Sequence, residues 1–406
     1  MMWSRARQAW FGSLACALLS ACSTGSSTPA WCRSDDAGAR VVVLPRKDAA
    51  SLTLRELWSV GGAEGPHVFG LPIGPVVSAG GRVAVPDLQM HTVIVLDVDG
   101  TWVGPVVRQG QGPGEVEWPA AAQWADDDHL LIFDLARGSV LRTRVGGGEA
   151  PSRWTVAPKV IAAVSAAGQL PGVHLAGNGA LILELLGTPV TGDPTHSRAA
   201  VVRLSPDGGV DTLEDQVTHV VGDGPYTHLV VPGSPRPVVA AATTGSIALA
   251  GSVAQYRIAV LNRSGDDSVL LCRPVPGLPY TDRERGEGFS GRREQILGRT
   301  LARLTLPAEP AAVGGIFFGA GGRLWVGRAR PDPGTMRAEG GAWDIIAADG
   351  TLVGTVDAPA RVVLFGEGGG HVYGLARGEH DEMSVVAYAL TDVDASATSP
   401  PPGGGG

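Results

Sequence analysis

Lysine is nearly absent from this chain, and acidic residues outnumber basic ones. Of the 406 residues, 40 are Asp or Glu and 32 are Lys or Arg, so the formal net charge is -8. Lys47 and Lys159 are the only lysines. Because nucleic-acid binding requires a positively charged face, this charge balance argues against a nucleic-acid partner.

The chain also lacks the short motifs that mark common active sites. It has no Gly-x-Ser-x-Gly nucleophile elbow and no His-x-His spacing of metal ligands. The glycine-rich stretch 110–115 is not a phosphate-binding loop, because no Lys-Ser/Thr follows it and it precedes a strand pattern. Residues 126–129, Asp-Asp-Asp-His, could suggest a cation site, but they lie between two predicted strands, where Asp favours turns. We therefore expect no catalytic residue, no cofactor and no metal.

The first 21 residues are predicted to be a secretory signal peptide. Arg5 and Arg7 precede an apolar run over residues 9–21, which is too short to span a bilayer permanently. The run ends in Leu-Ser-Ala-Cys22, which resembles the lipobox of bacterial lipoproteins. The resemblance implies cleavage before Cys22 and acylation of its thiol and new amine, and two or more acyl chains hold a protein stably on a membrane. An ordinary signal peptide with a cysteine near its end is the alternative.

The expected location is the cell envelope, with the membrane as a partner through the lipid anchor. Ser23 and not Asp follows Cys22, which in lipoproteins of this kind indicates the outer membrane, facing the periplasm or the cell surface. Residues 22–50 are then a lipidated tether and N-terminal segment.

Cysteine is scarce, and each of the four has a separate expected fate. Cys16 leaves with the signal peptide and Cys22 carries lipid, so Cys32 and Cys272 remain in an oxidising compartment. Disulfides persist there, so these two residues are a possible disulfide. Two buried or free thiols are the alternative.

Glycine and proline are abundant, with 59 and 30 residues, yet the hydrophobic content is 44%. This combination is typical of many short strands joined by tight turns. Residues 81–120 illustrate it, since apolar runs alternate with Asp-Gly and Pro-Gly turns without helical periodicity. A turn that ends in Asp-Gly or Ser-Gly recurs between the third and fourth strands of the predicted repeats, ending at Gly100, Gly208, Gly265 and Gly350.

We predict an all-β chain, a six-bladed β-propeller over residues 51–390, followed by a disordered Pro/Gly tail over residues 391–406. Five predicted blades have four strands, whereas the last, over residues 362–389, has three. The lone strand at residues 52–60 is expected to complete that blade and close the ring, and propellers leave only short sheet edges. Two interruptions, a long connection over residues 214–235 and a short helix over residues 292–303, are also expected.

Particular stretches resemble a known family. Gly-Gln-Gly-Pro-Gly-Glu at 110–115, then Trp118-Pro119 and a Leu-Leu-Ile-Phe-Asp strand, resemble NHL-type and TolB-like six-bladed propellers. Gly-Arg-Leu-Trp-Val at 322–326 and His-Val-Tyr-Gly-Leu at 371–375 resemble secreted bacterial lipoproteins of the same propeller type. The resemblance spans about residues 52–390 and implies six blades, with seven as the alternative because the third and fourth repeats are weak.

The expected function is binding. A rigid disc with variable loops, a lipid tether and no catalytic constellation is typical of a monomeric, non-enzymatic module that binds a protein, peptide or glycan. The alternative is a lyase or hydrolase with a metal in the central channel. For that alternative the candidate metal ligands are His67, His174, His228 and His371, and the candidate paired acids are Glu56, Glu64, Glu115 and Glu117. The tryptophans in or beside strands are expected to pack between blades; they are Trp58, Trp102, Trp118, Trp325 and Trp343.

Overall fold

The structure, a computed structural model, is built from β-strands. It describes residues 31–32, 39–47, 50–63, 65–156, 172–190, 193–206, 209–221, 229–230, 237–250, 255–262, 269–277, 311–328 and 340–392. Within these ranges the one helical element is a three-residue 3-10 turn, η2 (Ala320–Gly322). The described chain is therefore all-β, as predicted.

Most strands form groups of four in which neighbours along the chain pair antiparallel. We call these groups units. Unit 1 contains β3 (Val76–Val77), β4 (Val83–Asp87), β5 (Thr92–Leu96) and β6 (Trp102–Pro105), and unit 2 contains β9 (Pro119–Trp124), β10 (His129–Asp134), β11 (Ser139–Arg144) and β12 (Ser152–Thr155). Unit 3 contains β13 (Val173–Leu175), β14 (Leu181–Val190), β15 (Asp193–Leu204) and β16 (Val210–Val221), and unit 4 contains β18 (Val238–Ala241), β19 (Ile247–Ala250), β20 (Gln255–Leu261) and β21 (Val269–Pro276).

Units 5 and 6 are joined in one eight-stranded sheet. Unit 5 contains β22 (Gly315–Phe318), β23 (Leu324–Gly327), β24 (Gly341–Ile346) and β25 (Leu352–Ala358), and unit 6 contains β26 (Val362–Gly368), β27 (His371–Arg377), β28 (Met383–Asp392) and β2 (Ala50–Gly61). β2 comes from the N-terminal part of the chain and pairs antiparallel with β28 along Leu52–Gly61. Its first three residues pair parallel with β25, which links the two units.

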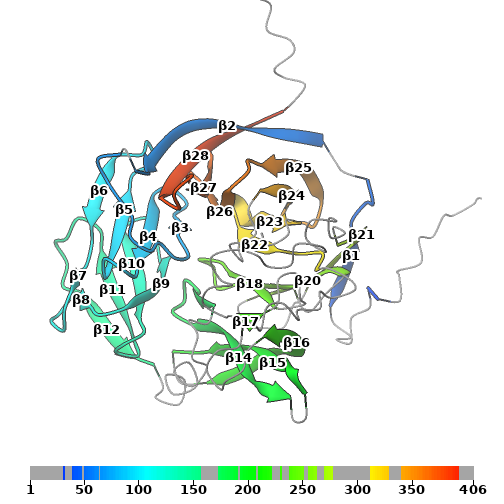
Figure 1. Ribbon diagram of the computed structural model, residues 1–406, viewed down its shortest axis with the longest axis horizontal. Helices are drawn as coiled ribbons and strands as arrows, with labels where there is room; N and C mark the ends of the chain where they lie inside the picture. Colours follow the sequence, from blue (N-terminus) through cyan, green and yellow to red (C-terminus); the bar gives the residue numbers. More distant parts are fainter. Residues whose placement is uncertain are drawn as a thin grey trace, which may run out of the picture.

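The units follow one another around a common centre in a propeller-like arrangement (Figure 1). The first strand of each unit is the innermost one. Each inner strand contacts the inner strand of the next unit, and the last of them, β26, contacts the first, β3.

The hydrophobic core lies between neighbouring units. Among the described residues, six buried clusters each combine side chains from two consecutive units, the last joining unit 6 to unit 1. In β10, Leu130 and Ile132 pack toward unit 1, whereas Leu131 and Phe133 pack toward unit 3. Strands buried on both faces need continuous apolar runs, which explains the Leu-Leu-Ile-Phe sequence.

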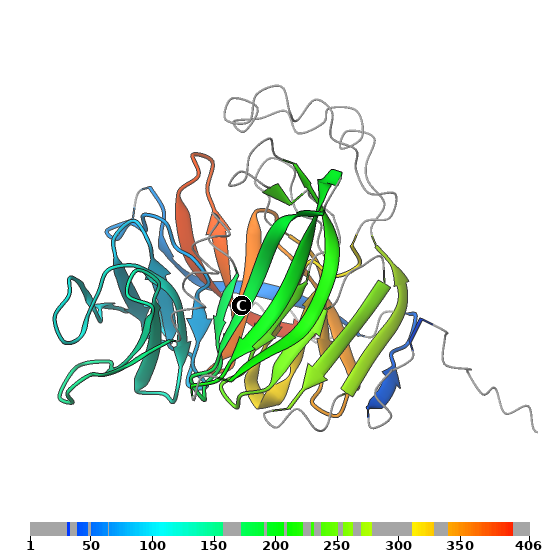
Figure 2. The same ribbon diagram turned by 90° about the horizontal axis from the view of Figure 1, so that it is seen from below.

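The connections lie at two ends of the molecule, because consecutive strands of a unit alternate in direction. Connections from the first to the second strand and from the third to the fourth lie at one end, which we call the turn end. Connections from the second to the third strand and from unit to unit lie at the opposite loop end (Figure 2). Neighbouring turns touch at the turn end, where Gly369 donates its backbone N–H to Ala79 and Gly177 donates to Ala242.

Three sequence-based expectations need correction. β1 (Arg40–Val43) lies in the N-terminal segment, where no strand was predicted, and it adds to unit 4 by pairing parallel with β21. β16 continues to Val221 and then pairs with β17 (Leu229–Val230), so part of the predicted connection at 214–235 is strand. β28 runs to Asp392, two residues into the predicted tail. These residues still have partners in β2, and the Thr391 hydroxyl lies 2.8 Å from that of Thr53.

Candidate functional site

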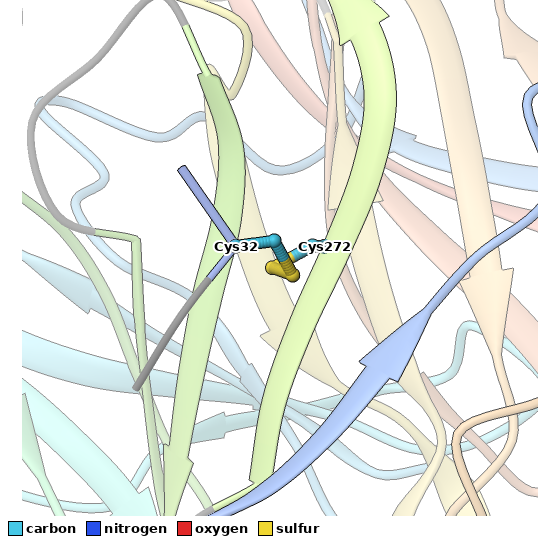
Figure 3. Close-up of a disulfide and its surroundings, with 2 residues drawn as sticks. All are labelled: Cys32 and Cys272. Atoms are coloured by element: carbon cyan, nitrogen blue, oxygen red, sulfur yellow. A yellow bond between two sulfur atoms is a disulfide. The ribbon is translucent and has the colours of Figure 1, made fainter. Parts of the chain in front are cut away.

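The two cysteines expected to pair are bonded to each other in the structure. Cys32 and Cys272 are both fully buried, with an S–S distance of 2.00 Å and a Cα–Cα distance of 5.9 Å (Figure 3). The bond ties the N-terminal segment to β21. Cys22, the predicted lipidation site, and the helix predicted over residues 292–303 lie outside the described residues.

The candidate histidines do not converge on the centre. The His67 ring stacks on Trp102, with ring centroids 4.0 Å apart, and Trp102 belongs to the outermost strand of unit 1. His174 Nε2 lies 3.0 Å from a Glu184 carboxylate oxygen, and His371 packs beside Tyr373. His228 lies outside the described residues.

The inner strands offer a poor donor set for a channel metal. Their described residues include two titratable side chains, His174 and Glu367. The Glu367 carboxylate accepts hydrogen bonds from Trp325 Nε1, at 2.8 Å, and from Arg323, and burial nevertheless raises its pKa. Within the described ranges, no group of three or more His, Cys, Asp or Glu side chains could hold a metal ion. The described residues therefore do not fit the predicted alternative of a metal held by three channel ligands.

The candidate acids have separate partners. Glu115 accepts the Gly112 backbone N–H inside its own glycine-rich turn, and Glu117 accepts a hydrogen bond from Gln111. Burial, with the nearby charge of Glu56, raises the pKa of Tyr388 to about 12. Glu64 lies outside the described residues.

The Asp126–His129 segment forms a turn, as predicted. One Asp126 oxygen accepts the backbone N–H groups of Asp128 and His129. The His129 ring lies between two carboxylates, 2.8 Å from Glu149 and 2.8 Å from Asp126. These two hydrogen bonds, the one to Glu149 first, raise the pKa of His129.

Two buried aspartates at the loop end fix the loops that enter units 1 and 2. Asp87 ends β4 and Asp134 ends β10, and both side chains are fully buried. Asp87 accepts four backbone N–H groups, from Gly70, Leu71, Gln89 and Met90. Asp134 accepts those of Glu117 and Trp118. The sequence signal for these buried aspartates, an Asp that ends an apolar run, is present in both strands, but the pattern alone predicts only where each strand ends.

The loops held by Asp87 and Asp134 expose apolar side chains. Val68, Leu71, Met90 and Trp118 have relative exposures of 59%, 44%, 51% and 42%. We call these four residues the apolar surface. The prediction that Trp118 packs between blades is wrong, because its backbone is held by Asp134 while its side chain faces solvent, whereas Trp325 and Trp343 are buried as predicted.

The backbone places the residues of the apolar surface near one another. The amides of Leu71 and Met90 donate to the same Asp87 oxygen, each at 3.0 Å. His91, next to Met90, has its ring nitrogen 2.6 Å from the Glu117 carbonyl oxygen, in the peptide group that leads into Trp118. Polar groups lie beside it, since Gln111 binds Glu117 and Arg137 donates to the Gln111 carbonyl. Exposed apolar side chains with polar groups nearby are common at protein interfaces.

Among the described residues, no helix is long and apolar enough to cross a membrane.

No protein family matches the sequence, and no curated protein matches it either. Similar solved structures include a member of the DUF4221 family from Bacteroides vulgatus, which is 8% identical, with 86% of this chain and 100% of that one covered and a TM-score of 0.49. Virginiamycin B lyase from Staphylococcus aureus is 12% identical, with 83% and 99% covered and a TM-score of 0.38. Regucalcin, a calcium-binding protein from Agrobacterium tumefaciens, is 12% identical, with 86% and 96% covered and a TM-score of 0.38. Similarity at this level transfers no activity, metal or ligand to the chain.

Proposed function

We propose that the protein is a six-bladed β-propeller, lipid-anchored at Cys22 in the cell envelope, that binds a protein, peptide or glycan through the apolar surface. It acts as a non-enzymatic binding module, and the outer membrane is its proposed location.

The described strands support the six-bladed, closed form. The six units supply six inner strands, each in contact with its two neighbours, and six core clusters lie between consecutive units. β2 takes the place of the fourth strand in unit 6 through its pairing with β28. A seventh blade would have to lie between two inner strands that already touch.

The observation that carries the binding function is the exposure of Trp118 and Met90 on a fixed backbone. Large apolar side chains are costly to leave in water, and tryptophan is among the commonest residues at interface hot spots. Because buried carboxylates hold the loops, binding would order few additional groups, which keeps its entropic cost low.

The test compares the apolar surface with equally exposed apolar residues elsewhere. Partners captured from the envelope fraction are identified by mass spectrometry, and the affinity of a purified partner is then measured by calorimetry. Trp118→Ala and Met90→Ala are expected to weaken binding about tenfold or more, the effect of losing a hot spot of about 2 kcal/mol. Val103→Ala and Val353→Ala, at 46% and 43% exposure, are the matched controls and should bind normally.

Two results would contradict the proposal. One is equal binding by all four variants, which would place the ligand elsewhere. The other is a stoichiometric divalent ion in the purified protein together with turnover of a substrate, which would favour the lyase or hydrolase.

A further inference from the structure

The N-terminal segment is fastened to the rim of unit 4 by several independent contacts. The disulfide joins Cys32 to β21, and β1 pairs parallel with the same strand, Arg40 opposite Val269 and Val43 opposite Cys272. We call Cys32 and β1 together the N-terminal clamp.

Hydrogen bonds extend the clamp on both sides of β1. Leu44 donates its backbone N–H to the Cys272 carbonyl at 2.7 Å. The buried Arg273 donates through Nε to the Pro45 carbonyl at 3.0 Å, while another of its nitrogens forms an ion pair with the buried Asp344 of unit 5. At the start of β1, Arg40 donates to the Asp349 carbonyl at 3.0 Å, in a turn of unit 5 at the turn end.

The clamp and the apolar surface lie on opposite sides of the molecule. β1 and β21 lie on the right of Figure 1, whereas units 1 and 2 lie on the left. The two features also differ in height, because β1 begins beside the turn end and the apolar surface is at the loop end.

We infer that the N-terminal clamp sets the orientation of the propeller on the membrane, with the rim of units 4 and 5 toward the lipid and the apolar surface away from it. This inference rests on the lipid anchor proposed at Cys22. Cys32 follows Cys22 by ten positions, so the first fixed point of the fold lies within roughly 35 Å of the anchored cysteine. The far side of the ring has no such attachment among the described residues, and it can therefore tilt away to meet a partner.

The experiment measures the distance of each side from the lipid. The lipidated protein is bound to vesicles that contain a quencher on the lipid headgroups, and a fluorophore is attached through Val353→Cys, near the clamp, or Met90→Cys, in the apolar surface. Cys32 and Cys272 are occupied by their own bond and Cys22 by lipid, so the added thiol is the one that is labelled. Quenching is expected to be severalfold stronger for the probe at 353 than for the probe at 90.

A second variant tests the role of the disulfide. Replacing both Cys32 and Cys272 by Ser moves the first fixed point to Arg40, which adds eight residues, or roughly 28 Å, of free chain. The difference between the two probes should then shrink, although β1 still holds the segment. A difference that does not change would show that the disulfide has no part in the orientation.

Failure of the anchor and failure of the orientation give different results. If the chain does not bind vesicles, or if Cys22→Ser binds as well as the unaltered chain, the proposed anchor is wrong. If the chain binds through Cys22 but both probes are quenched equally, or the probe at 90 more strongly, the orientation is overturned.

Discussion

At the scale of single residues, the most consequential groups are carboxylates that bind backbone, not ligands. Asp87 and Asp134 are fully buried, and each shapes a loop by accepting several N–H groups. A buried N–H without an acceptor is costly, so these side chains determine which conformation the loop adopts.

Asp87→Ala is expected to lower the free energy of unfolding by about 2 to 4 kcal/mol, because four backbone N–H groups lose their acceptor. Chemical denaturation measures the change. Asp87→Asn should lose less, since one amide oxygen remains as an acceptor. Asp99→Ala, in an exposed turn, is the control and should change little. A loss of stability for Asp87→Ala no larger than that for the control would contradict the role of Asp87 in holding these loops.

His129 is expected to give the protein a small dependence of stability on pH. Its pKa is raised by the hydrogen bonds to Glu149 and Asp126, so the native state favours the protonated ring. The stabilisation is therefore complete below the ordinary His pKa near 6.5 and is lost as the pH rises through the higher value of the folded protein. NMR titration of the ring should give a pKa above 6.5, and His129→Gln should remove the dependence. A ring that titrates at or below 6.5 would show that the contacts do not persist in solution.

Some of these residue-level features could be predicted from the sequence. The glycine-rich and Asp-rich stretches were correctly interpreted as turns, because Gly and Asp have local reasons to bend a chain. The exposure of Trp118 could not be predicted, because a local pattern shows that an aromatic residue lies beside a strand but not whether another unit covers it. The apolar surface depends on how two loops are held together, which no single stretch encodes.

At the scale of elements, β2 contacts unit 1 as well as unit 6, to which it belongs. Its Trp58 donates through Nε1 to the Val98 carbonyl of unit 1 at 3.1 Å, and its ring lies 5.9 Å from that of Tyr373 in unit 6. Gly100 leaves room for it, since a Cβ there would lie 2.8 Å from the indole. One side chain of β2 thus joins the last unit to the first.

Trp58→Phe should cost about 1 kcal/mol for the lost hydrogen bond, and Trp58→Ala about 3 kcal/mol because it also leaves a cavity. Denaturant unfolding of both variants distinguishes the two contributions. Leu57→Ala, at the neighbouring and more exposed position, is the control. Equal losses for Trp58→Ala and Leu57→Ala would show that the contact with unit 1 does not stabilise the fold.

The sequence predicts elements better than it predicts their extent. Runs with apolar residues on both strand faces and recurring turns placed nearly every strand of units 1, 2, 4, 5 and 6 correctly. β1 was missed because three valines without a neighbouring turn signal have no local partner, and the partner strand, β21, lies far along the chain. The β14–β16 hairpins of unit 3 extend further than expected because strand ends are set by pairing, not by propensity.

At the scale of the whole molecule, the disulfide encloses most of the chain. Cys32 and Cys272 are 240 positions apart, so the bond removes much of the freedom of the unfolded chain.

Replacing both cysteines by Ser is expected to lower the free energy of unfolding by about 5 kcal/mol, as chain entropy gives for a loop of this size. Calorimetry under oxidising and reducing conditions measures it. The unaltered protein should show the same loss when reduced, and the double variant should not respond to reductant. A double variant as stable as the oxidised protein would mean that β1 pairing alone holds the segment.

The pairing of β2 with β28 also limits when the fold can be completed during synthesis. A chain is synthesised from its N-terminus, yet Thr53 finds its partner Thr391 338 positions later. Until those residues emerge, most of β2 has no strand partner and the preceding units form an open arc. The first units can begin to fold early, but unit 6 is completed only when synthesis is almost finished. A chain that ends before β28 therefore keeps two unpaired strand edges, which can pair with other chains.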